Sequence, residues 1–204
     1  QAISADFGNR STTETLVAET RFLLAEIKHA SKSLERWMAA KHVPTELQYF
    51  PAKNRLLPQP LGVIGIIAPW NYPLQVTLAP AIAAIAAGNR VMIKPSELVP
   101  SFSALLRRLV AEKFDDTEVT VTGIEDHIAQ EFAALPFDHL IFTGSTRVGR
   151  LVAEAAGRNL TPVTLELGGK SPTIVDRSAD IAVAAERIAY AKLMNAGQTC
   201  IAPD

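Results

Sequence analysis

The chain has 204 residues, and its 20 Lys and Arg nearly balance its 21 Asp and Glu, for a formal net charge of -1 at pH 7. Without an excess of positive charge, neither nucleic acid nor an anionic membrane surface is an expected partner. Hydrophobic residues make up 48% and charged residues 20% of the chain, which is typical of a globular protein and argues against intrinsic disorder.

The location of the protein can be predicted from its single cysteine and its apolar segments. With only Cys200 present, no internal disulfide can form, and a reducing compartment such as the cytoplasm is expected. Residues 1–15 lack the basic and apolar regions of a signal peptide. The apolar region 61–93 is interrupted by Pro, Asn, Gln and Arg, so it does not predict a membrane span.

The first 60 residues are predicted to be helical and then extended. From Thr13 to Lys41 apolar residues recur at helical spacing among charged ones, which predicts one long helix or two in line. We expect the helix to end at His42-Val43-Pro44. Residues 48–60 alternate loosely and contain three prolines, which is typical of an extended or hairpin segment.

From residue 61 to residue 194, short apolar runs alternate with helical patterns. This alternation predicts an α/β fold with a doubly wound, largely parallel, Rossmann-like sheet. Ser101 is expected to cap the second helix, and Gly88-Asn89 to end the first. The predicted strands are 61–68, 91–93, 118–121, 139–142, 162–167 and 173–175, and the predicted helices are 74–87, 101–112, 124–135, 145–156 and 179–194.

Ligands bind such folds at the loops after the carboxyl ends of the strands, where three residues suit covalent chemistry. Asn71, held between two prolines, could donate to a developing oxyanion or simply cap the next helix. Cys200 follows Gly-Gln-Thr in a loop, as an accessible thiolate nucleophile would, although a lone cysteine can also fill a core. Glu166 ends a strand, where partial burial would raise its pKa toward that of a general base. Alternatively, Glu166 is an edge residue paired with Lys170.

Two further segments suit a nucleotide. Lys94 could contact a phosphate or ribose, and Glu97 could accept from vicinal ribose hydroxyls, or both could belong to a polar surface turn. Gly144 to Gly149 opens a helix whose N–H groups and dipole favour a pyrophosphate. The alternative is a Ser-capped helix with a packing glycine. Gly168-Gly169 would let a ligand or another chain segment come close.

Five motifs in this order resemble the aldehyde dehydrogenase superfamily: PWNYP (69–73), KPSE (94–97), FTGSTRVG (142–149), ELGGKSP (166–172) and GQTC (197–200). The stretch ADFGNRS (5–11) is similar to the coniferyl aldehyde dehydrogenase branch. The resemblance implies an N-terminal segment at 1–60, a dinucleotide-binding domain at 61–194 and the start of a catalytic domain at 195–204. It also implies a longer enzyme, so that 204 residues alone would be inactive and leave an apolar face uncovered.

The resemblance further implies the oxidation of an aldehyde to the carboxylic acid with NAD or NADP. Cys200 is then the nucleophile, Asn71 with the Cys200 N–H forms the oxyanion hole, and Glu166 activates the water that releases the acid. The residues implied to bind the cofactor are Ile67, Trp70, Lys94, Ser96, Glu97, Gly144, Ser145, Gly149 and Leu167. No metal site is implied.

The same resemblance separates some alternatives. The presence of Glu166 disfavours a reductase of activated acyl groups, and a non-catalytic nucleotide-binding protein remains the other alternative. Glu97 would repel a 2′-phosphate and so favours NAD, with Lys94 offsetting part of the repulsion. Leu74, Gln75 and Leu78 are expected to face an apolar or aromatic aldehyde. A homo-oligomer, dimer or tetramer, is implied.

Overall fold

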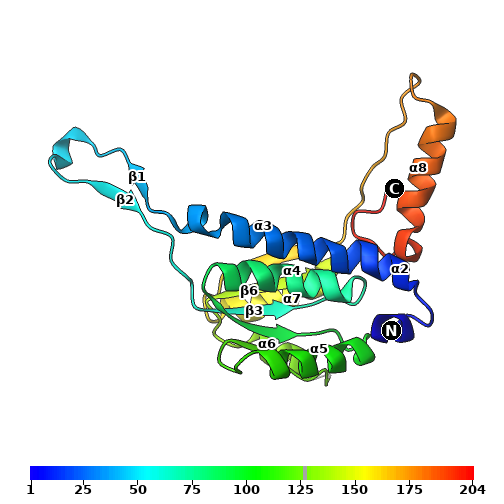
Figure 1. Cartoon of the computed structure of the whole chain (residues 1–204), viewed down its shortest axis with the longest axis horizontal. Coiled ribbons are helices and arrows are strands. Elements are labelled where there is room, and N and C mark those ends of the chain that lie inside the picture. Colours follow the sequence, from blue (N-terminus) through cyan, green and yellow to red (C-terminus); the bar gives the residue numbers. More distant parts are fainter. Residues whose placement is uncertain (126–127) are drawn as a thin grey trace.

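The computed structural model describes residues 1–125 and 128–204, and its centre is a parallel sheet of five strands (Figure 1). The strand order is β5-β4-β3-β6-β7, so the chain runs outward from β3 in one direction and then returns to build the other half. The predicted doubly wound sheet is therefore confirmed. The strands are β3 (Val63–Ile67), β4 (Arg90–Lys94), β5 (Val119–Val121), β6 (His139–Gly144) and β7 (Val163–Leu167).

Helices cover both faces of the sheet. Helices α4 (Pro73–Ala86) and α5 (Pro100–Lys113) pack on one face, while α6 (Ile128–Ala133) and α7 (Thr146–Gly157) pack on the other. Side chains alternate along β3, so Ile64 and Ile66 join the first apolar cluster and Ile67 joins the second. The order in which strands are added reverses between the neighbouring parallel strands β3 and β6. Ligands bind doubly wound sheets at this switch point, beyond the carboxyl ends of the two strands.

The N-terminal segment is largely helical, as predicted. After α1 (Ala2–Asp6), helix α2 (Thr12–Thr15), the π-helical turn η1 (Leu16–Thr20) and α3 (Arg21–Met38) follow one another without a break, and α3 lies across α4 (Figure 1). The antiparallel hairpin of β1 (Lys41–Val43) and β2 (Asn54–Leu56), with the short 3₁₀ turn η2 (Leu47–Tyr49), projects from the body. His42 and Val43 therefore form a strand, not the expected helix stop.

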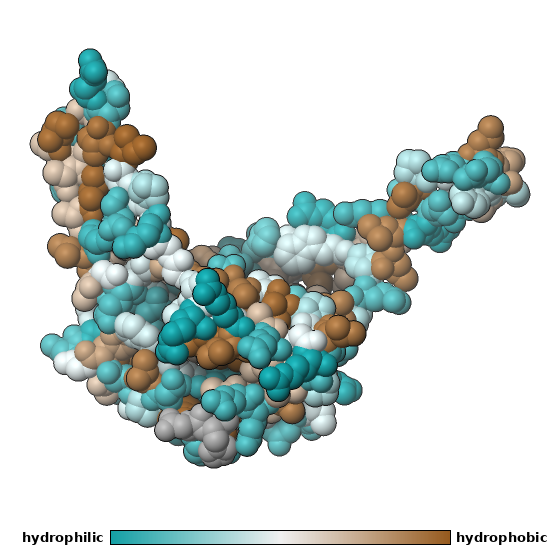
Figure 2. Space-filling model, turned by 180° about the vertical axis from the view of Figure 1, so that it is seen from behind, coloured by the Kyte–Doolittle hydropathy of each residue, from teal (hydrophilic) through white to brown (hydrophobic). Residues whose placement is uncertain are grey.

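A second arm follows the sheet. Helix α8 (Ile181–Leu193) stands away from the body, and the turn η3 (Met194–Gly197) at its base contacts the body (Figure 1). The strand predicted at 173–175 is wrong, because a strand needs a neighbour, and the described chain offers this segment only the backbone of residues 203–204. The side chain of Ile174 is accordingly 90% exposed. The expected apolar surface is present, since both arms, the hairpin of β1 and β2 and the segment of α8, carry exposed hydrophobic residues (Figure 2).

Element boundaries differ from those predicted by a few residues, among them those of α5 and α6. Helix α5 begins at Pro100 with Val99 as its N-cap, so Ser101 lies inside the helix and does not cap it. The predicted helix 124–135 is described as α6 from Ile128 to Ala133, and residues 126 and 127 lie outside the described residues. Within the described ranges, no helix combines the length and apolarity that crossing a membrane requires.

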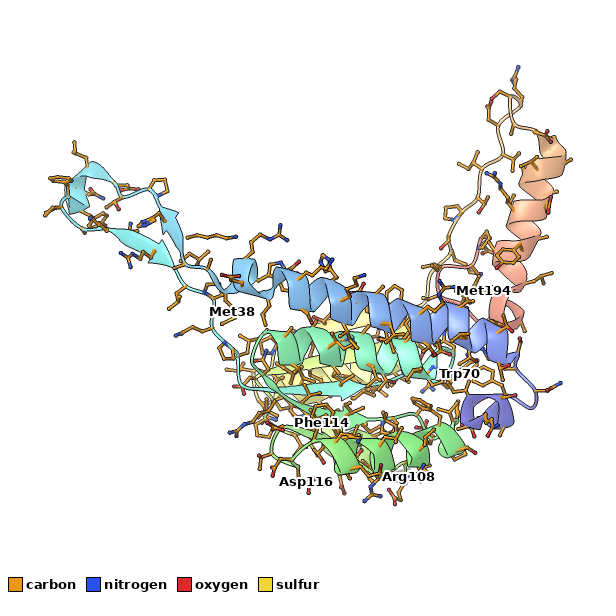
Figure 3. The ribbon with its side chains drawn as sticks, in the orientation of Figure 1. Met38, Trp70, Arg108, Phe114, Asp116 and Met194 are labelled. Carbon is orange, nitrogen blue, oxygen red and sulfur yellow. The ribbon has the colours of Figure 1, made fainter. Side chains whose placement is uncertain are left out.

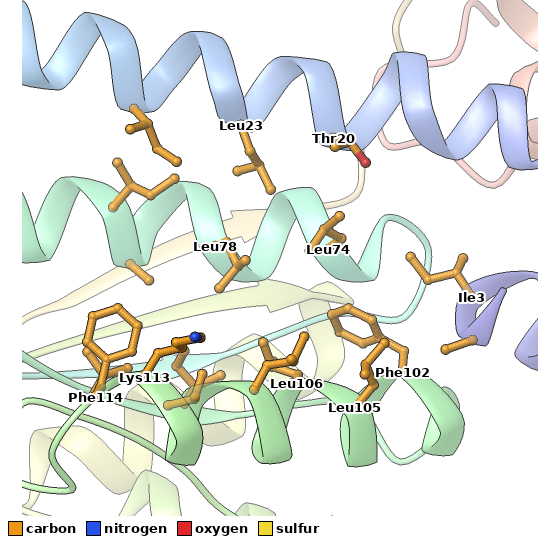
Figure 4. A pocket seen from close by; sticks show the side chains of 18 of the residues that line it. Ile3, Thr20, Leu23, Leu74, Leu78, Phe102, Leu105, Leu106, Lys113 and Phe114 are labelled. Carbon is orange, nitrogen blue, oxygen red and sulfur yellow. The ribbon is translucent and has the colours of Figure 1, made fainter.

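An apolar pocket of about 590 Å³ separates α3, α4 and α5 (Figure 4). Leu78 points from α4 toward Leu106 on α5, and Leu74 on α4 and Leu23 on α3 also line the pocket (Figure 4). Leu74 and Leu78 share the face of α4 that lines this pocket and packs against the first apolar cluster, and that they face an aldehyde stays a prediction. Gln75 lies on another face of α4, which lines a hollow beside Glu166.

Candidate active site

The loop after β3 and the loop before Cys200 are joined by hydrogen bonds. The side-chain nitrogen Nδ2 of Asn71 donates to the carbonyl oxygen of Gln198 at 2.9 Å. The hydroxyl of Tyr72 lies 2.8 Å from the hydroxyl of Thr199. Asn195 Nδ2 in turn donates to the carbonyl oxygen of Asn71 at 2.8 Å. The structure thus brings together the predicted oxyanion donor and the backbone next to the predicted nucleophile.

The loop before Cys200 has an unusual backbone. Asn195 and Ala196 have φ angles of 51° and 54°, and Gly197 has φ 80°. A left-handed conformation costs energy for residues other than glycine, and such residues persist where surrounding contacts hold them. Asn195 is buried, and its backbone N–H donates to Glu14 Oε1 at 2.8 Å. The N-terminal segment therefore helps to hold this loop, a contact that sequence reasoning missed.

Cys200 is exposed, so the alternative that it fills the core is wrong. The Gly168-Gly169 turn lies beside it. A Cβ atom on Gly169 would come within 3.1 Å of the carbonyl oxygen of Cys200, whereas one on Gly168 would meet nothing within 4 Å. The absence of a side chain at Gly169 therefore lets the Cys200 backbone come close, as the sequence predicts for this pair of glycines.

Glu166 is exposed, so the predicted partial burial is wrong. The edge strand β7 turns Leu165 and Leu167 toward α7 and presents Glu166 on the opposite face, which the described chain leaves open. Glu166 lines a hollow of about 510 Å³ with Gln75 and Thr143. The pairing of Glu166 with Lys170 is also wrong, because the Lys170 ammonium lies 3.1 Å from Asp204.

Lys94 and Glu97 form an ion pair directly after β4. Lys94 is buried, and its Nζ donates to Glu97 Oε2 at 2.5 Å. Burial alone would raise the pKa of Glu97, but the hydrogen bond from Lys94, a backbone N–H and the lysine charge lower that pKa below its ordinary value. Ser96 is also buried, and its hydroxyl accepts from the Leu98 N–H at 3.3 Å.

The segment 142–149 has the predicted form of a strand, a cap and a helix. Ser145 caps α7 by accepting from the Val148 N–H at 3.3 Å. A Cβ atom on Gly149 would lie 2.9 Å from Leu167 Cδ2, so this glycine lets α7 pack closely on β7. The alternative of a Ser-capped helix with a packing glycine is therefore confirmed, and such a helix still directs N–H groups toward the carboxyl edge of the sheet.

The other predicted cofactor residues have packing roles in this structure. Gly144 lies against the Phe142 ring, Ile67 is buried in the second apolar cluster, and Trp70 packs 6.2 Å from the Phe7 ring centre. Trp70 and Met194, from the two joined loops, lie at the same end of the molecule (Figure 3). That Ile67, Trp70, Ser96, Gly144 and Leu167 contact a cofactor stays a prediction.

Comparison with known proteins decides the family. The sequence pattern of the Aldehyde dehydrogenase family matches residues 4–204. The chain belongs to the aldehyde dehydrogenase family. It is 52% identical over its full length to a probable coniferyl aldehyde dehydrogenase of Pseudomonas aeruginosa, of which it covers 43%. The chain therefore spans less than half of this aldehyde dehydrogenase.

Two solved structures resemble the chain. An aldehyde dehydrogenase of Staphylococcus aureus, solved in a substrate-bound state, is 47% identical to the chain, with a TM-score of 0.95. The match covers the whole of this chain and 44% of the Staphylococcus protein. The protein PnpE, solved in complex with nicotinamide adenine dinucleotide, is 34% identical to the chain, with a TM-score of 0.75. That match covers 85% of this chain and 36% of PnpE. The fold of the chain is therefore that of an aldehyde dehydrogenase.

Proposed function

We propose that the protein containing this chain oxidises an aldehyde to the carboxylic acid with a nicotinamide cofactor. The observation that carries this proposal is the direct hydrogen bonding of the Asn71 loop to the loop of Cys200, at the carboxyl end of a doubly wound sheet. A thiol on a loop that is hydrogen-bonded to a fixed amide donor is suited to addition at a carbonyl group. Family membership supports the same reaction.

The chemistry of these residues follows in two stages. The Cys200 thiolate forms a bond to the aldehyde carbon. The negatively charged oxygen that develops accepts hydrogen bonds from the Asn71 side-chain N–H and the Cys200 backbone N–H. When bound, the cofactor supplies the acceptor for the hydride that leaves this carbon. The resulting thioester is attacked by a water whose proton passes to Glu166, and the C–S bond breaks to release the acid and the thiolate.

The polar groups at the carboxyl ends of the strands fit a dinucleotide. The N-terminus of α7, capped by Ser145, suits a pyrophosphate, and the half-exposed Glu97 carboxylate suits ribose hydroxyls. Lys94 is already paired with Glu97, so its charge is not free to compensate a 2′-phosphate. We therefore propose NAD as the preferred cofactor. The likeness to PnpE, which was solved with this dinucleotide, supports it.

We propose an aromatic aldehyde, such as coniferyl aldehyde, as the substrate. The name of the Pseudomonas relative supports this choice. The hollow that Glu166 lines is mostly apolar, with Val76, Ala79 and Pro80 of α4 along it. The exposed apolar residues of both arms support a homo-oligomer, and an exposed unpaired cysteine supports a reducing, cytoplasmic setting.

A single-turnover assay tests this function. The protein at its natural length is mixed with NAD and either aliphatic or aromatic aldehydes, and NADH absorbance is followed. We expect a burst that the Cys200→Ser variant lacks, and a burst without further turnover from Glu166→Gln. Folded, NAD-binding protein that gives no burst would overturn the dehydrogenase and favour a nucleotide-binding protein.

A further inference from the structure

Glu19 and Arg10 form a buried ion pair against the Asn71 loop. Glu19, in the π-helical turn η1, is fully buried, and its Oε1 accepts from Arg10 Nη1 at 2.8 Å. Its Oε2 accepts from the backbone N–H groups of Leu74 and Gln75 at 2.7 and 3.0 Å. Both oxygens of this carboxylate are thus used, and neither faces solvent.

The hydrogen bonds of Glu19 replace a missing helix cap. Helix α4 begins with Pro73, and its N-cap residue Tyr72 makes no side-chain cap hydrogen bond. The next two N–H groups would lack an intrahelical partner, and a carboxylate that accepts from them also complements the helix dipole. Glu19 therefore fixes the start of α4 from a position 55 residues earlier in the chain.

Arg10 contacts the same loop on the other side of Tyr72. Its Nη1 donates to the Asn71 carbonyl oxygen at 3.4 Å, and its guanidinium lies 5.0 Å from the Tyr72 ring centre and 5.1 Å from that of Phe7. The Asn71 carbonyl also accepts from Asn195. The ion pair therefore holds the backbone both before and after Tyr72, and through Asn71 it contacts the loop of Cys200.

From these contacts we propose that Arg10 and Glu19 are positioning residues, which set the Asn71 amide against the nucleophile loop. The proposal rests on the proposed function, because it assigns Asn71 to the oxyanion. A misplacement of about 1 Å can cost about 100-fold in rate. Among the described residues, the hydrogen bonds and ion pairs of Arg10 and Glu19 do not include Cys200, so the effect of the pair on the reaction acts through the Asn71 loop.

The structure contains a matched control. Helix α5 also begins with a proline, Pro100, after an N-cap residue without a side-chain cap. There Asp6 accepts from the N–H groups of Ser101 and Phe102 at 3.0 and 2.8 Å. Asp6 and Glu19 thus make the same kind of cap, but only the helix that Glu19 caps is preceded by Asn71. Replacing each carboxylate by its amide separates positioning from general loss of stability.

The experiment compares Glu19→Gln, Arg10→Lys and Asp6→Asn in the protein at its natural length. We expect Glu19→Gln to lower kcat and the burst rate about 10- to 100-fold with little change in the KM for aldehyde. Arg10→Lys, which keeps the charge, should lower kcat less than Glu19→Gln does. Asp6→Asn should change kcat less than about twofold, although it also removes a helix cap. Equal losses of kcat in Glu19→Gln and Asp6→Asn, or an unchanged kcat in Glu19→Gln, would overturn the proposal.

Backbone hydrogen exchange provides a readout that needs no activity. Glu19→Gln should speed exchange in residues 69–76 and 194–200, whereas Asp6→Asn should speed it at the start of α5. If the unaltered protein forms no NADH, the proposed function fails, and the exchange pattern still decides the positioning of the loops. Unchanged exchange in both segments of a folded Glu19→Gln variant would refute the positioning role.

Discussion

The side-chain nitrogen of Asn71 lies 2.9 Å from the carbonyl oxygen of Gln198, a residue 127 positions later in the chain. An amide nitrogen carries two N–H groups, and this hydrogen bond uses one of them. The bond therefore anchors the amide to the loop of Cys200 while its other N–H stays available as a donor. A donor fixed before the reaction needs no reorganisation when charge develops on a substrate oxygen.

Removing this amide should therefore act on the rate of the reaction. In the protein at its natural length, we expect Asn71→Ala to lower kcat by about 10²- to 10³-fold, the usual cost of one oxyanion donor. The KM for aldehyde should change little, because the donor acts on charge that develops after binding. Steady-state kinetics would measure both constants, with circular dichroism to verify folding.

The hydroxyl of Tyr72 provides the comparison for Asn71. Burial raises the pKa of Tyr72, although its hydrogen bond with Thr199 opposes this, so the hydroxyl stays protonated at neutral pH. Tyr72→Phe removes a link between the same two loops but no donor to the oxyanion. It should lower kcat far less than Asn71→Ala, and equal effects would contradict the role of the amide.

The ion pair of Lys94 and Glu97 leads to a prediction about cofactor choice. Glu97→Gln removes the carboxylate and frees the Lys94 ammonium, so the Kd for NADP relative to NAD should fall by about tenfold, or roughly 1.4 kcal/mol. Calorimetric titration of both cofactors would measure the ratio. Glu112→Gln, which removes a surface carboxylate on α5 that lies 4.0 Å from Arg108, is the control and should leave the ratio unchanged.

Local sequence patterns predict all five strands of the sheet, although they also predict a strand at 173–175 that does not form. The β-branched run of β3 and the Ser145 cap of α7 depend on near neighbours in the chain, and both were predicted correctly. The exposure of Glu166 could not be predicted in this way, because it depends on which elements cover β7. The sequence similarly predicts Ser101 as the cap of α5, whereas the N-cap position is Val99 and the capping side chain is that of Asp6, 95 residues before Ser101.

The candidate site shows the same limit. Asn71 and Cys200 stood out because prolines and glycine surround them, and their loops do meet. Glu19 had no such signal, since a glutamate in a helical run of mixed charges resembles a solvated residue. Its burial becomes visible only when Arg10 and the start of α4 are placed around it.

Glu19 also predicts a dependence of stability on pH. Burial raises its pKa above the ordinary 4.5, although the hydrogen bonds from Gln75 and Leu74 and the charge of Arg10 oppose the shift. The folded protein then retains a proton that the unfolded chain has lost. The stability that Glu19 contributes is therefore complete below about pH 4.5 and declines as the pH rises through the folded pKa.

Urea unfolding of the unaltered protein and of Glu19→Gln, from pH 4 to pH 7, would test this sign. The difference in unfolding free energy should decrease with rising pH, by at most about 1.4 kcal/mol per pH unit. Glu97→Gln, followed down to pH 3, provides the opposite case, because the lowered pKa of Glu97 contributes stability that is complete above about pH 4.5 and is lost as the pH falls through the folded pKa. A difference for Glu19→Gln that rises with pH would show that the pKa is lowered instead.

Asp6 predicts the energy of capping a helix from a distant segment. Pro100 has no N–H group, so the Ser101 and Phe102 N–H groups are the first that need acceptors, and Asp6 supplies one oxygen to each. Asp6→Ala should lower the free energy of unfolding by about 1–2 kcal/mol. Glu154→Ala removes an exposed carboxylate 3.5 Å from Arg158 and should cost at most about 0.5 kcal/mol, because exposed pairs are screened by solvent. Helix α1 packs against α5 through the buried Ile3 as well as through Asp6. Equal losses of unfolding free energy in Asp6→Ala and Glu154→Ala would therefore mean that apolar contact alone attaches the N-terminus.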